Sequence, residues 1–315
     1  MPRLEIRPFA DDHLDEAARR LAERHARHRE AEPLLPDVTD VRAEVESAWR
    51  AEGASGAAVL RDGELVGYLI GAPRDVDRWG ANVWVEAAGH AAVDAELVRD
   101  LYEVAATRWV DEGRARHYAL VPATDAALVD AWFRLSFGAQ HAHGIREVPD
   151  TTAYPDGVRD ASEDDVAAMV ELSPLLGRHQ ALAPVFGAPS REPTEEAIRQ
   201  DIAEDLAAHD VGNLVAEIDG RVVGNFVVVP ATMTSMHTGL ARPENAAFLG
   251  FAITAPEARG SGAGVALTEA CFAWARERGY DTMITDWRVT NLLSSRFWPR
   301  RGFRETFLRL YRSIP

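Results

Sequence analysis

The chain has 315 residues, of which 47% are hydrophobic, which is enough for substantial cores and comfortable for two domains. A formal net charge of −16 argues against nucleic acid as a partner, since phosphate contacts need clustered Arg or Lys, and one cysteine, Cys271, excludes a disulfide framework. The N-terminus has no apolar signal core and no run approaches a membrane span, so we expect no membrane partner and a cytoplasmic protein.

In the first half, apolar periodicity and turn residues predict alternating strands and helices. Asp62-Gly63 separates two of the strands and is typical of a hairpin turn. The expected strands cover 4–9, 57–60, 65–71, 82–86, 117–121 and 143–148, and the expected helices cover 11–29, 41–51, 95–112 and 125–135.

The second half repeats this order, beginning with a strand near Gly157, a cap at Ser162 and a helix. Residues 174–193, rich in Pro and Gly, predict an irregular insertion. The further strands are expected at 214–218, 222–230, 231–240, 248–254, 282–287 and 306–313, and the further helices at 194–208, from Val265 to about Arg278, and at 291–300.

The two halves align with each other, which indicates a duplicated domain. A constant shift of 166 superposes three pairs in particular: Gly279 on Gly113, Trp298 on Trp132, and Phe303 on Phe137. Earlier in the halves the shift is 157, where Gly224 meets Gly67. We therefore expect domains at 1–150 and 157–315, joined by a polar stretch.

A glycine-rich turn follows the strand at 248–254 and precedes a helix. It reads Arg259-Gly260-Ser261-Gly262-Ala263-Gly264. Such a turn offers unpaired backbone N–H groups at the positive end of a helix dipole, which suits a phosphate or pyrophosphate. A Walker loop is excluded because the chain contains no Lys, and the glycine spacing is not that of a Rossmann turn. A glycine-rich turn without a ligand remains the alternative.

The pattern Arg259-x-x-Gly262-x-Gly264 after Pro-Glu resembles the acyl-CoA pyrophosphate loop of the GCN5-related N-acetyltransferase (GNAT) superfamily. A second segment, from Asn291 to the Gly302-Phe303 pair, is similar to another motif of that family. The resemblance covers about 157–315. It implies an α/β (α+β) chain of two tandem GNAT folds, each a mixed, mostly antiparallel twisted sheet flanked by helices.

The first half lacks the loop, because the same shift places Val93, Glu96 and Val98 where the second half has Arg259, Gly262 and Gly264. We expect a degenerate domain that has lost CoA binding and serves as scaffold or as a wall of the substrate site. The alternative is that it binds something different through Trp79, Trp84 and His90.

The resemblance also implies which residues bind acetyl-CoA, the expected acyl donor, with no metal involved. Pantetheine would lie between two splayed strands that end at Thr254 and Trp287, and the glycine turn would hold the pyrophosphate. The residues assigned to the donor are Ile253, Thr254, Arg259, Gly260, Ser261, Gly262, Ala263, Gly264, Val265 and Asn291.

Catalysis is the less determined part of this interpretation. Trp298 stands where many family members have the Tyr that protonates the leaving thiolate, and an indole cannot act as that acid. It would instead donate a weak hydrogen bond to sulfur or pack against the thioester. Asp286 and His237 are the candidate bases, each with an ordinary structural role as its alternative, and Glu244 is expected to be a solvated loop residue. His179 and Phe186 are expected to line the acceptor pocket.

The leading hypothesis is an acyl-CoA-dependent N-acyltransferase that transfers acetyl to a primary amine by direct attack. The acceptor would be a small molecule or a peptide, and the protein a monomer or homodimer. The alternative is a non-catalytic acyl-CoA-binding or regulatory protein.

Overall fold

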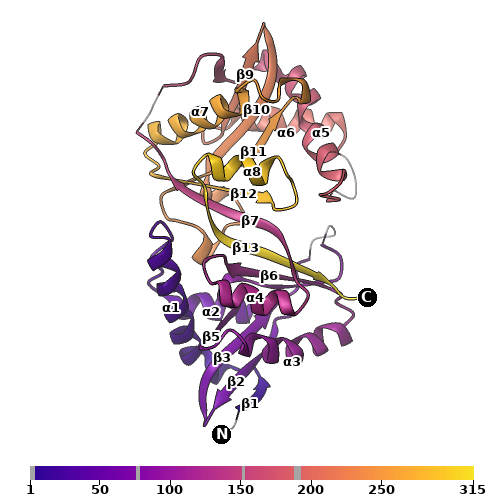
Figure 1. Cartoon of the computed structure of the whole chain (residues 1–315). Helices are drawn as coiled ribbons and strands as arrows, with labels where there is room; N and C mark the ends of the chain where they lie inside the picture. The colour runs from indigo at the N-terminus through magenta and orange to yellow at the C-terminus, as the bar shows by residue number, and fades with distance from the viewer. Residues whose placement is uncertain (1–3, 76–78, 151–152, 188–192) are drawn as a thin grey trace. The chain divides into compact units, whose positions relative to one another are not determined.

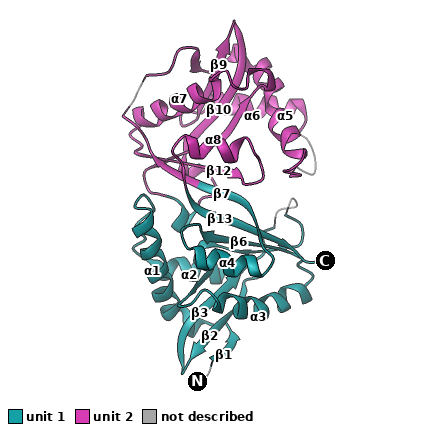
Figure 2. Ribbon diagram, in the orientation of Figure 1, with its two compact units in different colours: residues 1–143, 238–242, 305–315 teal, residues 144–237, 243–304 magenta. Residues whose placement is uncertain are grey.

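The chain folds into two compact units in a computed structural model that describes residues 4–75, 79–150, 153–187 and 193–315 (Figures 1 and 2). Unit 1 comprises Met1–His143, Thr238–Arg242 and Glu305–Pro315, and unit 2 comprises Gly144–His237 and Pro243–Arg304. Each unit is described by itself below.

Unit 1 is built on a small antiparallel sheet of strand order β1-β2-β3-β5 and on a second group of strands, in which β4 pairs parallel with β6 and β13 pairs antiparallel with β6. The turn between β2 and β3 has left-handed backbone at Asp62 and Gly63, as the predicted hairpin requires. The strands are β1 Leu4–Pro8, β2 Ser55–Arg61, β3 Glu64–Gly71, β4 Asn82–Val85, β5 His90–Ala92, β6 Arg116–Pro122 and β13 Arg304–Ser313.

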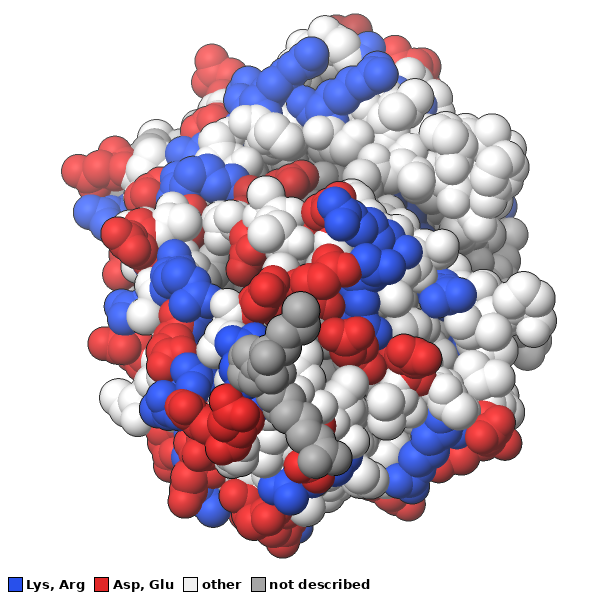
Figure 3. Space-filling view, turned by 60° about the horizontal axis from the view of Figure 1, so that its bottom comes forward, with Lys and Arg blue, Asp and Glu red and all other residues white. Residues whose placement is uncertain are grey.

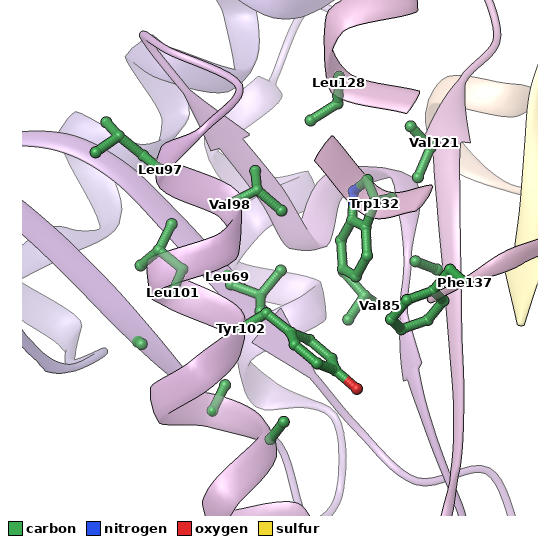
Figure 4. Packing of buried hydrophobic residues seen from close by; sticks show 14 of the residues in the cluster. Leu69, Val85, Leu97, Val98, Leu101, Tyr102, Val121, Leu128, Trp132 and Phe137 are labelled. Atoms are coloured by element: carbon green, nitrogen blue, oxygen red, sulfur yellow. The ribbon is translucent and has the colours of Figure 1, made fainter. Parts of the chain in front are cut away.

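Helices cover both faces of these strands, because successive strand residues point to opposite sides. On one face Tyr102 and Trp132, from α3 and α4, pack with Val85 and Val121 (Figure 4). On the other face Tyr68 and its neighbours pack against α1 and α2. The helices are α1 Leu14–Ala31, α2 Val41–Arg50, α3 Leu97–Asp111 and α4 Ala126–Arg134.

Unit 2 contains a mixed sheet in which β12-β11-β10-β9-β8 are successive neighbours. Only β11 and β12 pair in parallel among these strands, and the other pairs are antiparallel. The strands are β8 Val158–Asp160, β9 Gly212–Ile218, β10 Arg221–Pro230, β11 Ala246–Thr254 and β12 Thr282–Arg288; the helices are α5 Val166–Ala181, α6 Glu195–Ala207, α7 Ala263–Glu277 and α8 Ser294–Arg300. Strand β7, Gly138–Glu147, begins in unit 1 and enters unit 2 at Gly144.

The two units are interleaved along the chain. The last strand, β13, belongs to unit 1 from residue 305 on, where Phe307 and Leu310 are fully buried. The end of β7 belongs to unit 2, where the Val148 N–H donates to the Asp281 carbonyl over 2.8 Å. The compact units therefore are not two consecutive stretches of chain. The boundary drawn from the sequence repeat, between 150 and 157, concerns the repeated sequence and stays a prediction.

The structure differs from the sequence expectations in three places. Residues 231–240 form no strand; they contain the short 3-10 helices Ala231–Met233 and Gly239–Ala241, because β11 already occupies the edge of β10 as far as Pro230. The expected irregular insertion at 174–193 is wrong up to Ala181, since α5 continues through Pro174. Leu175 and Leu176 pack against a buried cluster there, which offsets the hydrogen bond that proline removes.

The third difference is a strand that the sequence did not predict. The strand expected at 82–86 is β4, and a short 3-10 turn, Ala87–Gly89, separates it from β5. A side chain at Gly89 would collide with the Ile70 carbonyl oxygen at 2.6 Å, so this turn lies directly against β3.

On the face drawn in Figure 3, acidic and basic side chains are interspersed. No helix within the described ranges is both long enough and apolar enough to cross a membrane.

Unit 1 buries several imidazoles, which makes its stability sensitive to acid. Burial lowers the pKa of His28 and of His90 to about 3, from an ordinary value of 6.5, and it also lowers the pKa of His25. These rings are neutral in the folded chain and take up a proton when it unfolds. The contribution of His28 and of His90 to stability is therefore complete above pH 6.5 and is lost as the pH falls toward 3, at about 1.4 kcal/mol per pH unit for each of these two groups. His25 acts in the same direction.

We predict that the melting temperature falls steadily from pH 6.5 downward, as measured by calorimetry. His28→Leu removes one titrating group and should flatten the profile. His209→Leu, at an exposed histidine, is the matched control and should not change the slope. Equal slopes in all three proteins would contradict this account.

Candidate functional site

The site in unit 2 begins where two parallel strands part. β11 and β12 pair from Ala246 with Thr282 to Leu249 with Thr285, and the pairing stops there. The rest of β11 pairs only with β10, and a bulge at Gly250 breaks the register between Val227 and Val228. We call the part in which β11 and β12 no longer pair with each other the splay; it consists of Gly250–Thr254 of β11 and Asp286–Arg288 of β12.

The hydrogen-bond alternation of β11 decides which backbone groups face β12. The Ala255 N–H donates to the Val223 carbonyl of the neighbouring β10 segment over 2.8 Å. In an antiparallel ladder every second residue bonds the same neighbour, so Ile253 bonds β10 as well. The backbone groups of Ala252 and Thr254 therefore point away from β10, toward the side of the splay.

The glycine turn after β11 presents several N–H groups without a partner. Gly260 and Gly262 have left-handed backbone, with φ of 85° and 97°, and Gly262 caps α7. Within the described residues, the backbone N–H groups of Gly260, Gly262, Gly264 and Val265 donate to no backbone or side-chain acceptor.

Two further N–H groups of the turn are used locally. The Ser261 N–H donates to the Ala258 carbonyl over 3.2 Å, and the Ala263 N–H donates to Ser261 Oγ over 3.3 Å. Four donors thus remain at the positive end of the α7 dipole, and Arg259 beside them is exposed and makes no ion pair with any described residue. This arrangement favours a multiply charged anion.

Asp286 and His237, both predicted from sequence as bases, lie together in the structure. Asp286 is the first residue of β12 beyond the paired stretch, and its side chain is 22% exposed. His237 Nε2 lies 3.9 Å from Asp286 Oδ1, and the His237 side chain is 1% exposed. Phe248 of β11 flanks the imidazole, with the ring centroids 5.2 Å apart. The pair therefore sits at the start of the splay.

Trp298 is a core residue of unit 2. It is 5% exposed, and its ring makes edge contacts with Phe297 and Phe303 at centroid distances of 4.9 and 5.5 Å. Phe226, which pairs with Ala252 across the ladder, lies 6.2 Å away. The indole thus packs in an aromatic cluster beside the splay.

Asn291 is buried in the turn before α8. Its Oδ1 accepts the Leu293 N–H over 3.1 Å and lies 3.2 Å from His179 Nε2, at the end of α5. His179 therefore contacts Asn291, a pairing that the sequence did not predict. Phe186 is 76% exposed, and Glu244 is exposed as expected.

Unit 1 has no equivalent turn, because its α3 satisfies its own first N–H groups. The Glu96 N–H donates to Asp94 Oδ1 over 3.0 Å, and those of Leu97, Val98 and Arg99 donate to carbonyls just upstream. Glu96 also places a carboxylate at this helix end, paired with Arg99. An anion at this helix end would find the N–H groups of residues 96–99 already bonded and would meet a like charge.

In unit 1 a side chain joins the two strands that are equivalent to the parting strands of unit 2. Ala92 of unit 1 pairs with Gly67, and Thr254 of unit 2 pairs with Gly224, the glycine equivalent to Gly67. Ala92 is therefore equivalent to Thr254, and His90, two residues earlier, is equivalent to Ala252 of the splay. The His90 Nε2–H donates to the Leu120 carbonyl of β6 over 3.0 Å. This imidazole, fully buried, joins the two strands that would otherwise part.

The Arg24 guanidinium, on α1, stabilises the same region. It donates to the carbonyls of His90 and Ala87, and it is 4% exposed. Burial lowers the pKa of Arg24 to about 10. His90 is thus fully buried and inaccessible to a ligand.

Trp79 and Trp84, the other residues of the alternative proposed for the first half, belong to an aromatic cluster. Trp84 stacks on Tyr118 at 4.4 Å, and the Arg74 guanidinium covers the Trp84 ring at 3.9 Å. Trp79 meets both rings edge-on. These contacts give the two tryptophans a packing role.

Comparison with known proteins identifies the fold. Residues 159–303 match the acetyltransferase (GNAT) family. A solved GCN5-related N-acetyltransferase from Sphaerobacter thermophilus aligns over 99% of this chain and 96% of its own length, with a TM-score of 0.57 and 16% identity. The expected pair of tandem GNAT folds, with mixed sheets flanked by helices, is confirmed. No curated protein matches the sequence.

Two further solved structures align with nearly the whole chain. A GCN5-related glucosamine N-acetyltransferase region in a fungal multi-domain beta-N-acetylglucosaminidase covers 99% of this chain and 38% of its own, with a TM-score of 0.55 and 14% identity. A tandem GNAT protein from the clavulanic acid biosynthesis pathway covers 99% and 98%, with a TM-score of 0.48 and 14% identity.

Two glycines of the turn should respond differently to alanine. No atom lies within 4 Å of a Cβ built at Gly262, so Gly262→Ala should cost only the left-handed backbone strain, about 1 kcal/mol, and lower the melting temperature by a few degrees. Gly264 lies in α7 with ordinary contacts at 3.5 Å or more, so Gly264→Ala should be neutral or slightly stabilising. Equal losses in both variants would contradict this geometry.

Proposed function

We propose that this chain is an acyl-CoA-dependent N-acyltransferase whose active site lies in unit 2, since residues 159–303 match the acetyltransferase (GNAT) family. The observation that carries the proposal is the set of four unpaired N–H groups at the start of α7, next to a strand pair that parts. A pyrophosphate and its pantetheine arm have the charge and the extended shape that these two features suit.

In this proposal acetyl-CoA is the donor, held chiefly by backbone. Gly260, Gly262, Gly264 and Val265 would bind the pyrophosphate, and Arg259 would add charge at its rim. The ladder alternation favours Thr254 over Ile253 as the backbone partner of pantetheine. Ile253 would contribute through its side chain, which packs in a buried cluster with α5.

The transfer itself needs a base more than an acid. A primary amine of a small molecule or peptide attacks the thioester carbonyl; a C–N bond forms, the C–S bond breaks, and the amine loses a proton. Asp286, paired with His237, is the proposed acceptor of that proton. The backbone N–H of Ala252 would stabilise the oxyanion. The thiolate leaves without help from Trp298 and takes its proton from solvent.

One observation favours a second candidate, a protein that binds acyl-CoA without turnover. Trp298 is buried among aromatic rings at the position where the family often has an acidic hydroxyl. Binding would need only the glycine turn and the splay, so the two candidates differ in turnover and not in affinity.

We predict that titration calorimetry finds one equivalent of acetyl-CoA bound per chain. Gly264→Ala should remain folded yet bind more weakly, because its methyl group obstructs approach to the free N–H groups, and Gly262→Glu should abolish binding. No binding by the native chain would refute the proposed function. Two equivalents, or one that survives Gly262→Glu, would show a second site.

Turnover is tested by CoA release from acetyl-CoA against a panel of primary amines. We predict that Asp286→Asn lowers kcat by about 10²–10⁴ while the affinity for acetyl-CoA is unchanged, as expected for loss of a general base. Glu244→Gln, in the exposed loop, is the matched control and should behave as the native protein. Acetyl-CoA binding without turnover on any amine would favour the non-catalytic candidate.

A further inference from the structure

Helix α5 contacts both strands that border the splay, and it does so with two different parts of its length. Its apolar side meets the first strand: Leu172 packs in one buried cluster with Ile253, Ala255 and Ala258, at the end of β11 and the start of the glycine turn. This contact fixes the helix against the strand that leads into the loop.

The polar end of α5 meets the segment that follows the second strand. His179 Nε2 lies 3.2 Å from Asn291 Oδ1, and Gln180 Oε1 accepts from Arg288 Nε over 3.0 Å. The Asn291 N–H donates to the Arg288 carbonyl over 3.0 Å, so these two residues close one turn between β12 and α8. Two consecutive side chains of α5 therefore hold both ends of that turn.

The hydrogen bonds of Asn291 determine its amide orientation and the tautomer of His179. The backbone N–H of Leu293 can only donate, so the Asn291 atom that it meets is the oxygen. The His179 nitrogen facing the same oxygen must then be the donor, with its proton on Nε2. With its oxygen engaged twice, Asn291 keeps its two amide hydrogens for other partners.

We propose that His179 is a positioning residue for the acyl-CoA site: through Asn291 it ties the end of β12 to α5, and α5 is packed on β11, so that the two strands of the splay are held at a fixed separation before the donor binds. Gln180 supports the same turn through Arg288. The effect on acetyl-CoA rests on the proposed function, whereas the ordering of the turn does not.

The test compares His179→Ala with His179→Gln, which keeps a side-chain donor, and with His209→Ala, an exposed histidine outside the site. In the ligand-free proteins, hydrogen exchange at the Leu293 amide should be faster in His179→Ala, partly restored in His179→Gln and unchanged in His209→Ala. In calorimetry, His179→Ala should bind acetyl-CoA about five- to tenfold more weakly, the loss of one hydrogen bond.

The two measurements separate the inference from the proposed function. Unchanged exchange at Leu293 in His179→Ala overturns the positioning role, whatever the affinity. Faster exchange together with native acetyl-CoA affinity overturns the link to the donor site. If the native chain binds no acetyl-CoA, the proposed function fails, and the exchange result alone decides whether His179 orders the turn.

Discussion

The site of unit 2 depends on the point where β11 and β12 stop pairing, at Leu249 and Thr285. Backbone groups in a sheet normally satisfy each other, and here the groups of Ala252 and Thr254 lose that neighbour while β10 keeps the other edge of β11 in place. The Gly250 bulge accommodates the change of register. The proposed site for the donor depends on this break, because it leaves backbone donors and acceptors of β11 without a strand neighbour shortly before the glycine turn in the chain.

Unit 1 shows what the same fold does when that break is closed. His90, at the position of Ala252, reaches the Leu120 carbonyl with its imidazole, and Arg24 fills the space behind it from α1. The N–H groups in the first turn of α3 donate to acceptors just upstream in the chain, and Glu96 adds a negative charge. These side chains fill the core of unit 1 where unit 2 has its proposed binding site. The scaffold role of the first half and the single donor site in the chain stay predictions.

Much of the site was predictable because it is local. The glycine turn lies within six residues of sequence, and its left-handed glycines and helix start follow from residue type alone. Asp286 and His237 were each found as candidates, but their proximity depends on the path of 231–240, which was expected to be a strand and is not. The contact of His179 with Asn291 joins positions 112 apart, and no pattern around either residue signals it.

The continuation of α5 through Pro174 was missed because proline disfavours a helix locally, whereas burial of Leu175 and Leu176 decides the outcome. The placement of β13 in unit 1 is likewise a tertiary result, since the sequence repeat assigns that strand to the second half.

The most direct test of the central claim is a crystal structure of the chain grown with CoA. We predict pyrophosphate oxygens within hydrogen-bond distance of the N–H groups of Gly262, Gly264 and Val265, with the pantetheine arm along Thr254 and Ala252. Density for CoA at α3 of unit 1, or at a place remote from the glycine turn of unit 2, would contradict it.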